Sequence, residues 1–315
     1  MLIALAAAFG LVADPPHFVH EYTLPIGVYP SSIVAGPDGA LWFSTYPYYT
    51  NHPPIHLGIG RITTSGHVTY YPVNHGTYDV TAGPDGRLWF TSPYRKPYIV
   101  GAITTSGLIA TWPAQSDGLP ESIIAGPDGN LWYTAFGGNP DILAISTVGT
   151  LVAQYYAGKG FVVRLGRGRD LVWYNMPARV GRITKNGKET GHDIGGPTYI
   201  PELMALGPDN RMWECDGTYI VALTVDFTAT FYPIPTGVNG TYGLTRGPDG
   251  NMWATDFDQG KLLRITTAGV MTTFDIPTPN MIPSGITVGP DGNIWYTEIQ
   301  MQTDVAKIGV FDPGR

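Results

Sequence analysis

The stretch that decides the fold is Gly-Pro-Asp-Gly-Ala-Leu-Trp-Phe at residues 36–43, which recurs along the chain. Further copies begin at Gly83, Gly126, Gly207, Gly247 and Gly289, and a divergent copy without the proline runs from Gly166 to Tyr174. The tryptophans of the seven copies are spaced 40 to 47 residues apart. Repetition at about 40 residues, with four short strands per unit, is the signature of a β-propeller.

Each copy joins a tight turn to a buried strand. Pro37 presets the first corner, the Asp38 side chain bonds to the local backbone, and Gly39 takes the left-handed conformation that closes the hairpin. The Leu-Trp-Phe run that follows is apolar on both faces, which favours a strand packed between two neighbouring blades. A second repeated segment, typified by residues 60–66 (Gly-Arg-Ile-Thr-Thr-Ser-Gly), predicts another hairpin in each unit.

The two ends of the chain predict how the ring closes. The last unit ends near Phe311 after three strands, whereas residues 17–22 form an isolated strand pattern at the start. An open array would leave unpaired strand edges at both ends. We therefore expect an all-β, seven-bladed propeller of four-stranded antiparallel blades over residues 14–315, in which the N-terminal strand completes the last blade.

Composition and charge exclude several classes of function. The net charge is −7 and no run of Lys or Arg occurs, so a nucleic-acid surface, which needs clustered cations, is not expected. Cys215 is the only cysteine, which excludes a disulfide framework and a thiolate metal cluster. We expect a monomer.

The first thirteen residues form an apolar run that ends at Asp14-Pro15-Pro16. The run is too short for a membrane span but fits the core of a signal peptide, although no Lys or Arg precedes it. We expect a secreted or periplasmic protein; the alternative is a cytoplasmic chain with an apolar arm.

These motifs resemble those of the streptogramin B lyase (virginiamycin B lyase) family of propellers. The resemblance rests on residues 126–134 (Gly-Pro-Asp-Gly-Asn-Leu-Trp-Tyr-Thr), on the Gly-Arg-Ile-Thr-Thr type of hairpin, and on the Tyr-Pro-Ile-Pro-Thr connector at 232–236. It extends from about Glu21 onward and implies the propeller fold.

The resemblance also implies an activity, namely elimination that linearises a cyclic depsipeptide antibiotic. In the family, Mg²⁺ held by two glutamates works with a histidine base. One glutamate and the histidine form a Glu-x-His motif just before a Gly-x-Asp-Gly turn, and the other glutamate ends a Trp-Phe-Thr-Glu strand. No copy in this chain has the Glu-x-His motif, and only the strand-end carboxylate is present, as Glu298.

Carboxylates are expected to gather on the face that carries the longer loops, at the mouth of the central channel. They lie near the starts of inner strands or after second strands, at Asp79, Glu121, Glu202, Glu214, Asp256, Asp258 and Glu298. Converging carboxylate oxygens would bind a hard cation, Mg²⁺ or Ca²⁺. The alternative is that these side chains are simply solvated.

Tyrosines and histidines gather in the same predicted region. The insertion in blade one contains Tyr46, Tyr48, Tyr49, His52 and His56. Tyrosines offer large amphipathic contact area, so this segment is either a recognition surface or a cover over the next blade. Tyr78 and Tyr242 complete the predicted ligand-binding set.

His75 is the candidate base from outside the family motif, paired with Glu298, although loop histidines are often bystanders. The sequence thus favours an exported propeller that binds a small molecule or peptide on its loop face. The alternative is a Mg²⁺-dependent lyase or hydrolase that acts on a cyclic peptide or lactone with a rearranged active site. A purely structural module is a third interpretation.

Overall fold

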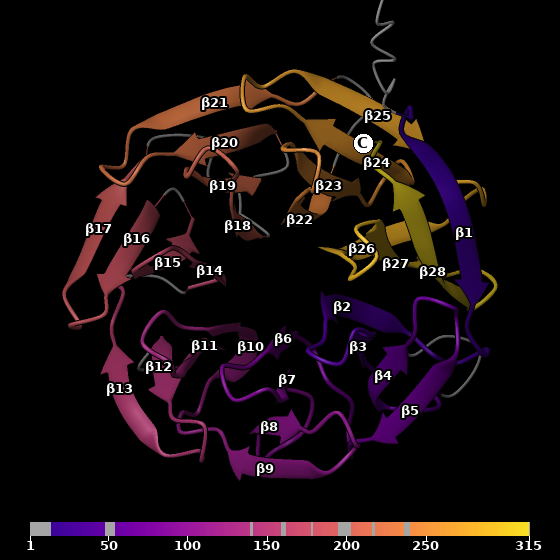
Figure 1. The fold of residues 1–315 in the computed structure, drawn as a ribbon. Helices are drawn as coiled ribbons and strands as arrows, with labels where there is room; N and C mark the ends of the chain where they lie inside the picture. The colour runs from indigo at the N-terminus through magenta and orange to yellow at the C-terminus, as the bar shows by residue number, and fades with distance from the viewer. Residues whose placement is uncertain are drawn as a thin grey trace, which may run out of the picture.

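The computed structural model describes residues 14–47, 54–138, 141–158, 162–177, 179–194, 203–215, 218–235 and 240–314. These residues form seven four-stranded antiparallel sheets arranged in a ring, and no helix occurs among them (Figure 1). The predicted seven-bladed propeller is therefore confirmed. No described segment is a helix long and apolar enough to cross a membrane.

The strands follow the repeat, from the innermost to the outermost strand of each blade. Blade one contains β2 (Pro30–Ala35), β3 (Leu41–Thr45), β4 (Gly58–Ile62) and β5 (Val68–Pro72); blade two contains β6 (Val80–Ala82), β7 (Leu88–Ser92), β8 (Ile99–Ile103) and β9 (Ile109–Pro113); blade three contains β10 (Leu119–Ala125), β11 (Leu131–Phe136), β12 (Ile142–Ile145) and β13 (Leu151–Tyr155).

The remaining blades have the same plan. Blade four contains β14 (Arg164–Arg167), β15 (Leu171–Met176), β16 (Arg179–Thr184) and β17 (Glu189–Asp193); blade five contains β18 (Met204–Leu206), β19 (Met212–Cys215), β20 (Tyr219–Leu223) and β21 (Ala229–Pro233); blade six contains β22 (Thr241–Arg246), β23 (Met252–Asp256), β24 (Lys261–Ile265) and β25 (Met271–Asp275); blade seven contains β26 (Ile282–Val288), β27 (Ile294–Gln300), β28 (Val305–Asp312) and β1 (His17–Thr23).

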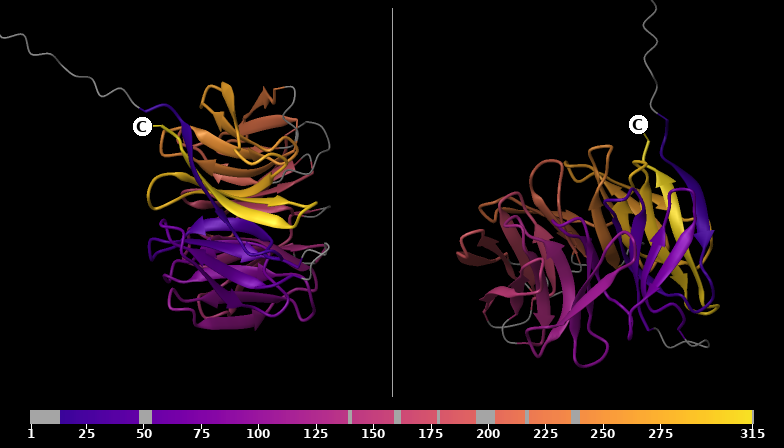
Figure 2. Two further views of the ribbon diagram at one scale, coloured as in Figure 1. Left: turned by 90° about the vertical axis from the view of Figure 1, so that its right-hand side faces the viewer. Right: turned by 60° about the horizontal axis from the view of Figure 1, so that its bottom comes forward.

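The N-terminal strand closes the ring, as predicted. β1 pairs antiparallel with β28, with His17 opposite Asp312 and Thr23 opposite Lys307, and it crosses the thickness of the disc (Figure 2). Glu21 of β1 forms an ion pair with Lys307 and accepts a hydrogen bond from Thr278 Oγ1 at 2.6 Å. The first and last segments of the chain are thus locked together by backbone and side-chain bonds.

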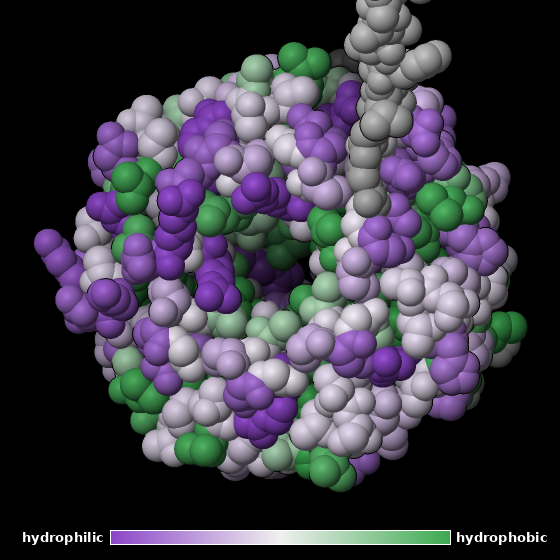
Figure 3. All heavy atoms as spheres, viewed as in Figure 1, coloured by the Kyte–Doolittle hydropathy of each residue, from purple (hydrophilic) through white to green (hydrophobic). Residues whose placement is uncertain are grey.

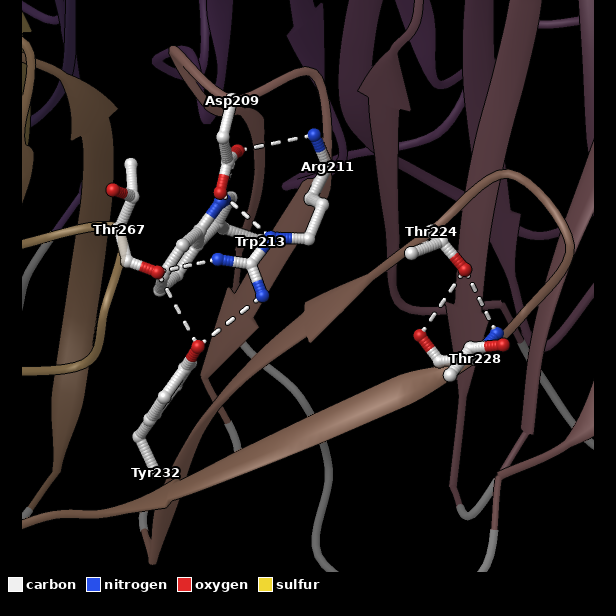
Figure 4. A network of polar contacts seen from close by, with 7 residues as sticks. All are labelled: Asp209, Arg211, Trp213, Thr224, Thr228, Tyr232 and Thr267. Atoms are coloured by element: carbon white, nitrogen blue, oxygen red, sulfur yellow. Dashed lines mark hydrogen bonds and ion pairs between the residues drawn. The ribbon is translucent and has the colours of Figure 1, made fainter.

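The repeat tryptophans lie in the interfaces between blades, and their indole N–H groups donate hydrogen bonds to the aspartates of the turns. In each Gly-Pro-Asp turn the aspartate Oδ1 accepts the indole N–H, at 2.9 to 3.1 Å. Figure 4 shows blade five, where Asp209 accepts from Trp213 and also pairs with Arg211, which stacks on the indole. Each hairpin is therefore anchored to the interface it caps.

A belt of hydroxyl groups binds neighbouring blades together around the channel. In blade seven, Thr297 Oγ1 accepts the Gly285 N–H of its own inner strand at 2.9 Å and donates to the Ser31 carbonyl of blade one at 2.7 Å. Equivalent hydroxyls, two residues after the repeat tryptophan, make both bonds in other blades, at Ser44, Thr91 and Thr255.

The hydroxyl belt determines the backbone structure at the channel mouth, because it stabilises β-bulges in the inner strands there. The inner strands β2, β10, β22 and β26 each shift register at this point. A bulge re-aims side chains and leaves backbone groups without ladder partners, and the hydroxyls supply those partners. The ring surrounds a central hollow (Figure 3), so the residues at the bulges are held at one end of it.

Replacing Thr297 with valine should destabilise the ring. Valine keeps the shape of threonine but leaves the Gly285 N–H and the Ser31 carbonyl without this partner, which should lower the free energy of unfolding by about 1–3 kcal/mol. Urea denaturation would measure the loss. Thr297→Ser keeps the hydroxyl and should retain most of the stability; equal loss in both variants would contradict a role for the belt.

Candidate functional site

A pocket lies at the mouth of the channel, where the inner strands begin; we call this side of the disc the loop face. Its volume is about 230 Å³, and it is bordered by aromatic and aliphatic side chains together with two serines: Ser31, Tyr46, Tyr78, Tyr242, Phe257, Ser284, Ile299 and Met301. We call it the mouth pocket. Ser31, Tyr242 and Ser284 belong to inner strands, whereas Tyr46 and Phe257 follow second strands.

Three residues of the predicted ligand-binding set thus come together from blades one, two and six: Tyr46, Tyr78 and Tyr242. Other rings support them. Tyr242 lies beside Phe257 with ring centroids 5.7 Å apart, and Tyr78 packs edge-on against Tyr94 at 6.4 Å. Tyr94 is largely buried, and burial raises its pKa well above the ordinary value. The pocket is therefore walled by packed rings and not by freely solvated ones.

A smaller chamber of about 70 Å³ lies deeper in the channel and is bordered by Tyr78, Asp79, Arg164 and Tyr242, among others. The Arg164 side chain is 5% exposed, donates to Tyr78 Oη at 2.9 Å, and lies over the Tyr78 ring. Burial opposes its charge, but the neighbouring Tyr78, Tyr242 and Asp79 raise its pKa. Arg164 therefore stays a cation at the base of the site.

Among the described residues, Asp79 is the one predicted carboxylate that borders this chamber. Its oxygens accept the backbone N–H groups of Val80 at 2.9 Å and of Ile123 at 3.0 Å. Burial raises the pKa of Asp79, while a hydrogen bond from Ser32 and the charge of Arg164 oppose that shift. Asp79 thus links blade two to blade three and lies close enough to Arg164 to offset its positive charge. Both carboxylate oxygens are occupied by this structural role.

Glu298 lies inside the interface between blades six and seven and does not border the mouth pocket. Thr297, the preceding residue, points to blade one, so the alternation of a strand turns Glu298 to the opposite face. It is 0% exposed, and within the described part of the chain neither oxygen has a partner at normal hydrogen-bond distance, although the Glu21 carboxylate lies close enough to affect it. Burial and the nearby charge of Glu21 raise its pKa to about 9.

The other predicted metal ligands are dispersed. Asp256 is buried and accepts the backbone N–H groups of Asp258 and Gln259, so it caps its own turn. Glu214 is buried next to Asn175, and Asp258 is exposed at the loop-face rim. The carbonyl of Glu121 belongs to the hydroxyl belt. Glu202 lies outside the described residues.

The described residues therefore do not fit the metal that the family resemblance implies. Among them, no group of three or more His, Cys, Asp or Glu side chains is placed to hold an ion. The candidate family ligand, Glu298, is enclosed in a blade interface and has a raised pKa, whereas a ligand must be ionised and reachable. We derive no chemical step through Mg²⁺ or Ca²⁺.

The two predicted histidines that the structure describes, His75 and His56, lie apart from Glu298. His75 is exposed in the connection between β5 and β6, with a positive φ of 86°. His56 stacks on Tyr70 with ring centroids 4.3 Å apart, which makes it part of the cover of blade one. Tyr48, Tyr49 and His52 lie outside the described residues. The structure does not bring His75 and Glu298 together.

Sequence reasoning missed Arg164, Phe257, Ile299 and Met301. Arg164 lies two residues before the divergent blade-four copy, where the lost proline removes the signal that sets the strand register. The sequence could have predicted Phe257 and Met301 as pocket residues, because both follow the second strand of their blade, as Tyr46 does. Carboxylates, and not apolar groups, were the expected functional residues at these strand ends.

Comparison with known proteins agrees with this architecture. The model of the Virginiamycin B lyase family matches residues 13–174 and 156–312. The virginiamycin B lyase of Staphylococcus aureus is 24% identical in sequence, with 93% of this chain and 99% of that chain covered and a TM-score of 0.80. A streptogramin B lyase structure is 22% identical, with coverage of 94% and 98% and the same TM-score of 0.80.

A third solved structure is a catalytically inactive histidine-to-alanine variant of the Staphylococcus aureus enzyme with quinupristin. It is 25% identical, covers 93% of this chain and 99% of its own, and has a TM-score of 0.80. The search of curated proteins gave no match. Since the family model spans nearly all of the propeller, this chain belongs to the virginiamycin B lyase family.

Proposed function

We propose that this chain is an exported binding propeller whose mouth pocket holds a small-molecule or peptide ligand. The observation that carries the proposal is the lining of the pocket. Its described residues are aromatic, aliphatic or hydroxyl-bearing, and none of them is His, Asp or Glu. Such a lining supplies contact area and hydrogen bonds, but neither the histidine base nor the metal-binding glutamates that the family resemblance implies for the elimination.

The size of the pocket suggests how a ligand binds. At about 230 Å³ it is smaller than the several hundred Å³ typical of drug-sized ligands. It therefore takes one apolar or aromatic group, while the rest of the ligand lies over the loop face. Tyrosines suit such contacts, because their rings give apolar area and their hydroxyl groups remain available at the rim.

Arg164 adds a polar recognition element below the tyrosines. A guanidinium has five N–H donors in a fixed fork, and one of them bonds to Tyr78 in the described structure. The cation at the base favours a carbonyl or other oxygen acceptor at the leading end of the ligand. Quinupristin, which is present in the structure of the related lyase variant, is the first ligand to test.

The second candidate function is a lyase with a rearranged active site, and membership of the family favours it. The chain lacks a Glu-x-His sequence, and the described residues provide no metal site. An enzyme of this kind would have to use residues outside the family motif.

Export is part of the proposal because of the apolar segment at residues 1–13. The N-terminal sequence of protein recovered from culture medium or periplasm would test it.

The Tyr242→Ala and Phe257→Ala variants should weaken quinupristin binding at least about tenfold, because each removes a wall of the mouth pocket. Isothermal titration calorimetry measures the affinity. Tyr156→Ala, at a tyrosine 60% exposed beyond β13, is the matched control and should bind like the parent protein. Equal affinities in all four proteins would contradict the mouth pocket as the binding site.

Mass spectrometry of quinupristin incubated with the protein should show no linearised product, with Mg²⁺ or with EDTA, because the described residues place no histidine in the mouth pocket and form no metal site. A Mg²⁺-dependent product of unchanged mass would overturn the binding proposal in favour of the lyase.

Glu298→Gln should stabilise the protein at alkaline pH. The raised pKa of about 9, against an ordinary value of 4.5, means that the folded state favours the protonated acid. Wild-type stability should therefore fall as pH rises from about 4.5 to 9, and the glutamine variant should escape that loss. Melting temperatures should nearly agree at pH 4.5 and diverge steadily toward pH 9.

Added Mg²⁺ distinguishes this structural role from metal binding. It should leave both melting curves unchanged. If Mg²⁺ raised the melting temperature of the parent protein but not that of Glu298→Gln, Glu298 would be a metal ligand after all.

A further inference from the structure

A groove adjoins the mouth pocket on the loop face, over blades six and seven. It has a volume of about 540 Å³, and its lining includes the polar residues Asp258, Gln259, Asp275, Thr278, Asn280 and Gln302. The lining of the pocket passes into that of the groove through consecutive residues at two places, Phe257 to Asp258 and Met301 to Gln302. A ligand held in the pocket can therefore continue into the groove.

Asp258 lies at this junction with an exposed carboxylate. Its backbone N–H donates to Asp256 Oδ1 at 3.2 Å, which anchors the loop. Its carboxylate is close to the entry of β22, since a Cβ built on Gly240 would lie 3.3 Å from Asp258 Oδ2. Within the described residues, no hydrogen bond or ion pair engages this carboxylate, whereas Asp275, the other acid of the groove, is paired with Lys261.

Two aromatic rings belong to the same two segments as this carboxylate and its neighbour Gly240. Phe257 directly precedes Asp258, and Tyr242 lies two residues beyond Gly240 in β22. Their ring centroids are 5.7 Å apart with an interplanar angle of 33°. Aromatic faces attract cations, most strongly where water is partly excluded, and the adjacent carboxylate has the complementary charge.

We infer that Asp258, Tyr242 and Phe257 form a subsite for a protonated amine, at the rim where the mouth pocket meets the groove. This inference rests on the proposed function and narrows its ligand class to amphipathic, amine-bearing compounds or peptides. The lining of the mouth pocket offers no anionic group among its described residues, so the amine stays at the rim beside Asp258 while the apolar part of the ligand enters the pocket.

The test compares two probes that differ in one group, phenethylammonium and 2-phenylethanol. NMR titration of the full-length protein measures both dissociation constants. We expect the ammonium compound to bind about fivefold more tightly to the parent protein, the effect of one exposed cation–π and carboxylate site. Asp258→Asn should abolish this preference, and Tyr242→Ala should weaken both probes.

Asp275→Asn is the matched control, since Asp275 lies in the same groove but is already paired. It should keep the preference for the ammonium probe, and thermal melts should show that all variants are folded. Equal binding of the two probes to the parent protein would overturn the subsite. The subsite would also be overturned if both Asp275→Asn and Asp258→Asn lost the preference. The general negative charge of the groove, and not a specific site, would then explain the effect.

Quinupristin titrated against the same samples separates this inference from the proposed function. A preference for phenethylammonium without quinupristin binding would support the subsite and reject quinupristin as the ligand. Quinupristin binding that is unchanged in Asp258→Asn, with no preference between the small probes, would leave the proposed function standing and refute the subsite.

Discussion

In five of the seven blades a hydroxyl follows the repeat tryptophan by two residues, and this hydroxyl makes the contact on which the rest of the structure depends. A propeller blade with a bulged inner strand leaves an N–H and a neighbouring C=O without ladder partners, next to a narrow channel. Burying such groups without a partner costs about 1–3 kcal/mol each. Thr297 and its equivalents satisfy one group in their own blade and one in the next. Closing the ring and forming the mouth are thus one process.

The two faces of the disc follow from this arrangement. The turns at the ends of the inner strands are held by bonds between aspartate and indole, and they repeat with little change. At the loop face the backbone is fixed by the belt, but the side chains beside it point into the mouth and are not needed for closure. Variation can therefore accumulate at the loop face without loss of the fold, and differences in function are expected there.

The sequence predicted the fold because its signals are local: a turn that needs proline and glycine, and a tryptophan at a constant distance. It also predicted Tyr46, Tyr78 and Tyr242, because tyrosines next to strand ends on this face must lie near the channel. It could not place Glu298, whose position depends on which side of β27 it occupies. The neighbouring Thr297 bond decides that side, and it becomes visible only when two blades are seen together. Arg164 was missed because the divergent copy in blade four gives no reliable register.

Binding and elimination place different demands on such a mouth. The elimination that the family resemblance implies uses a base and a metal at fixed separations, so the loss of either disables that reaction. Binding needs contact area, a few hydrogen bonds and charge complementarity, which many side chains can provide. The residues whose carbonyls the belt holds include Ser31, Tyr78, Glu121 and Ser284. Their backbones are equivalent, yet their side chains range from hydroxyl to phenol to carboxylate. A family built on this belt can therefore exchange catalytic groups for recognition groups while the backbone of the site stays where it was.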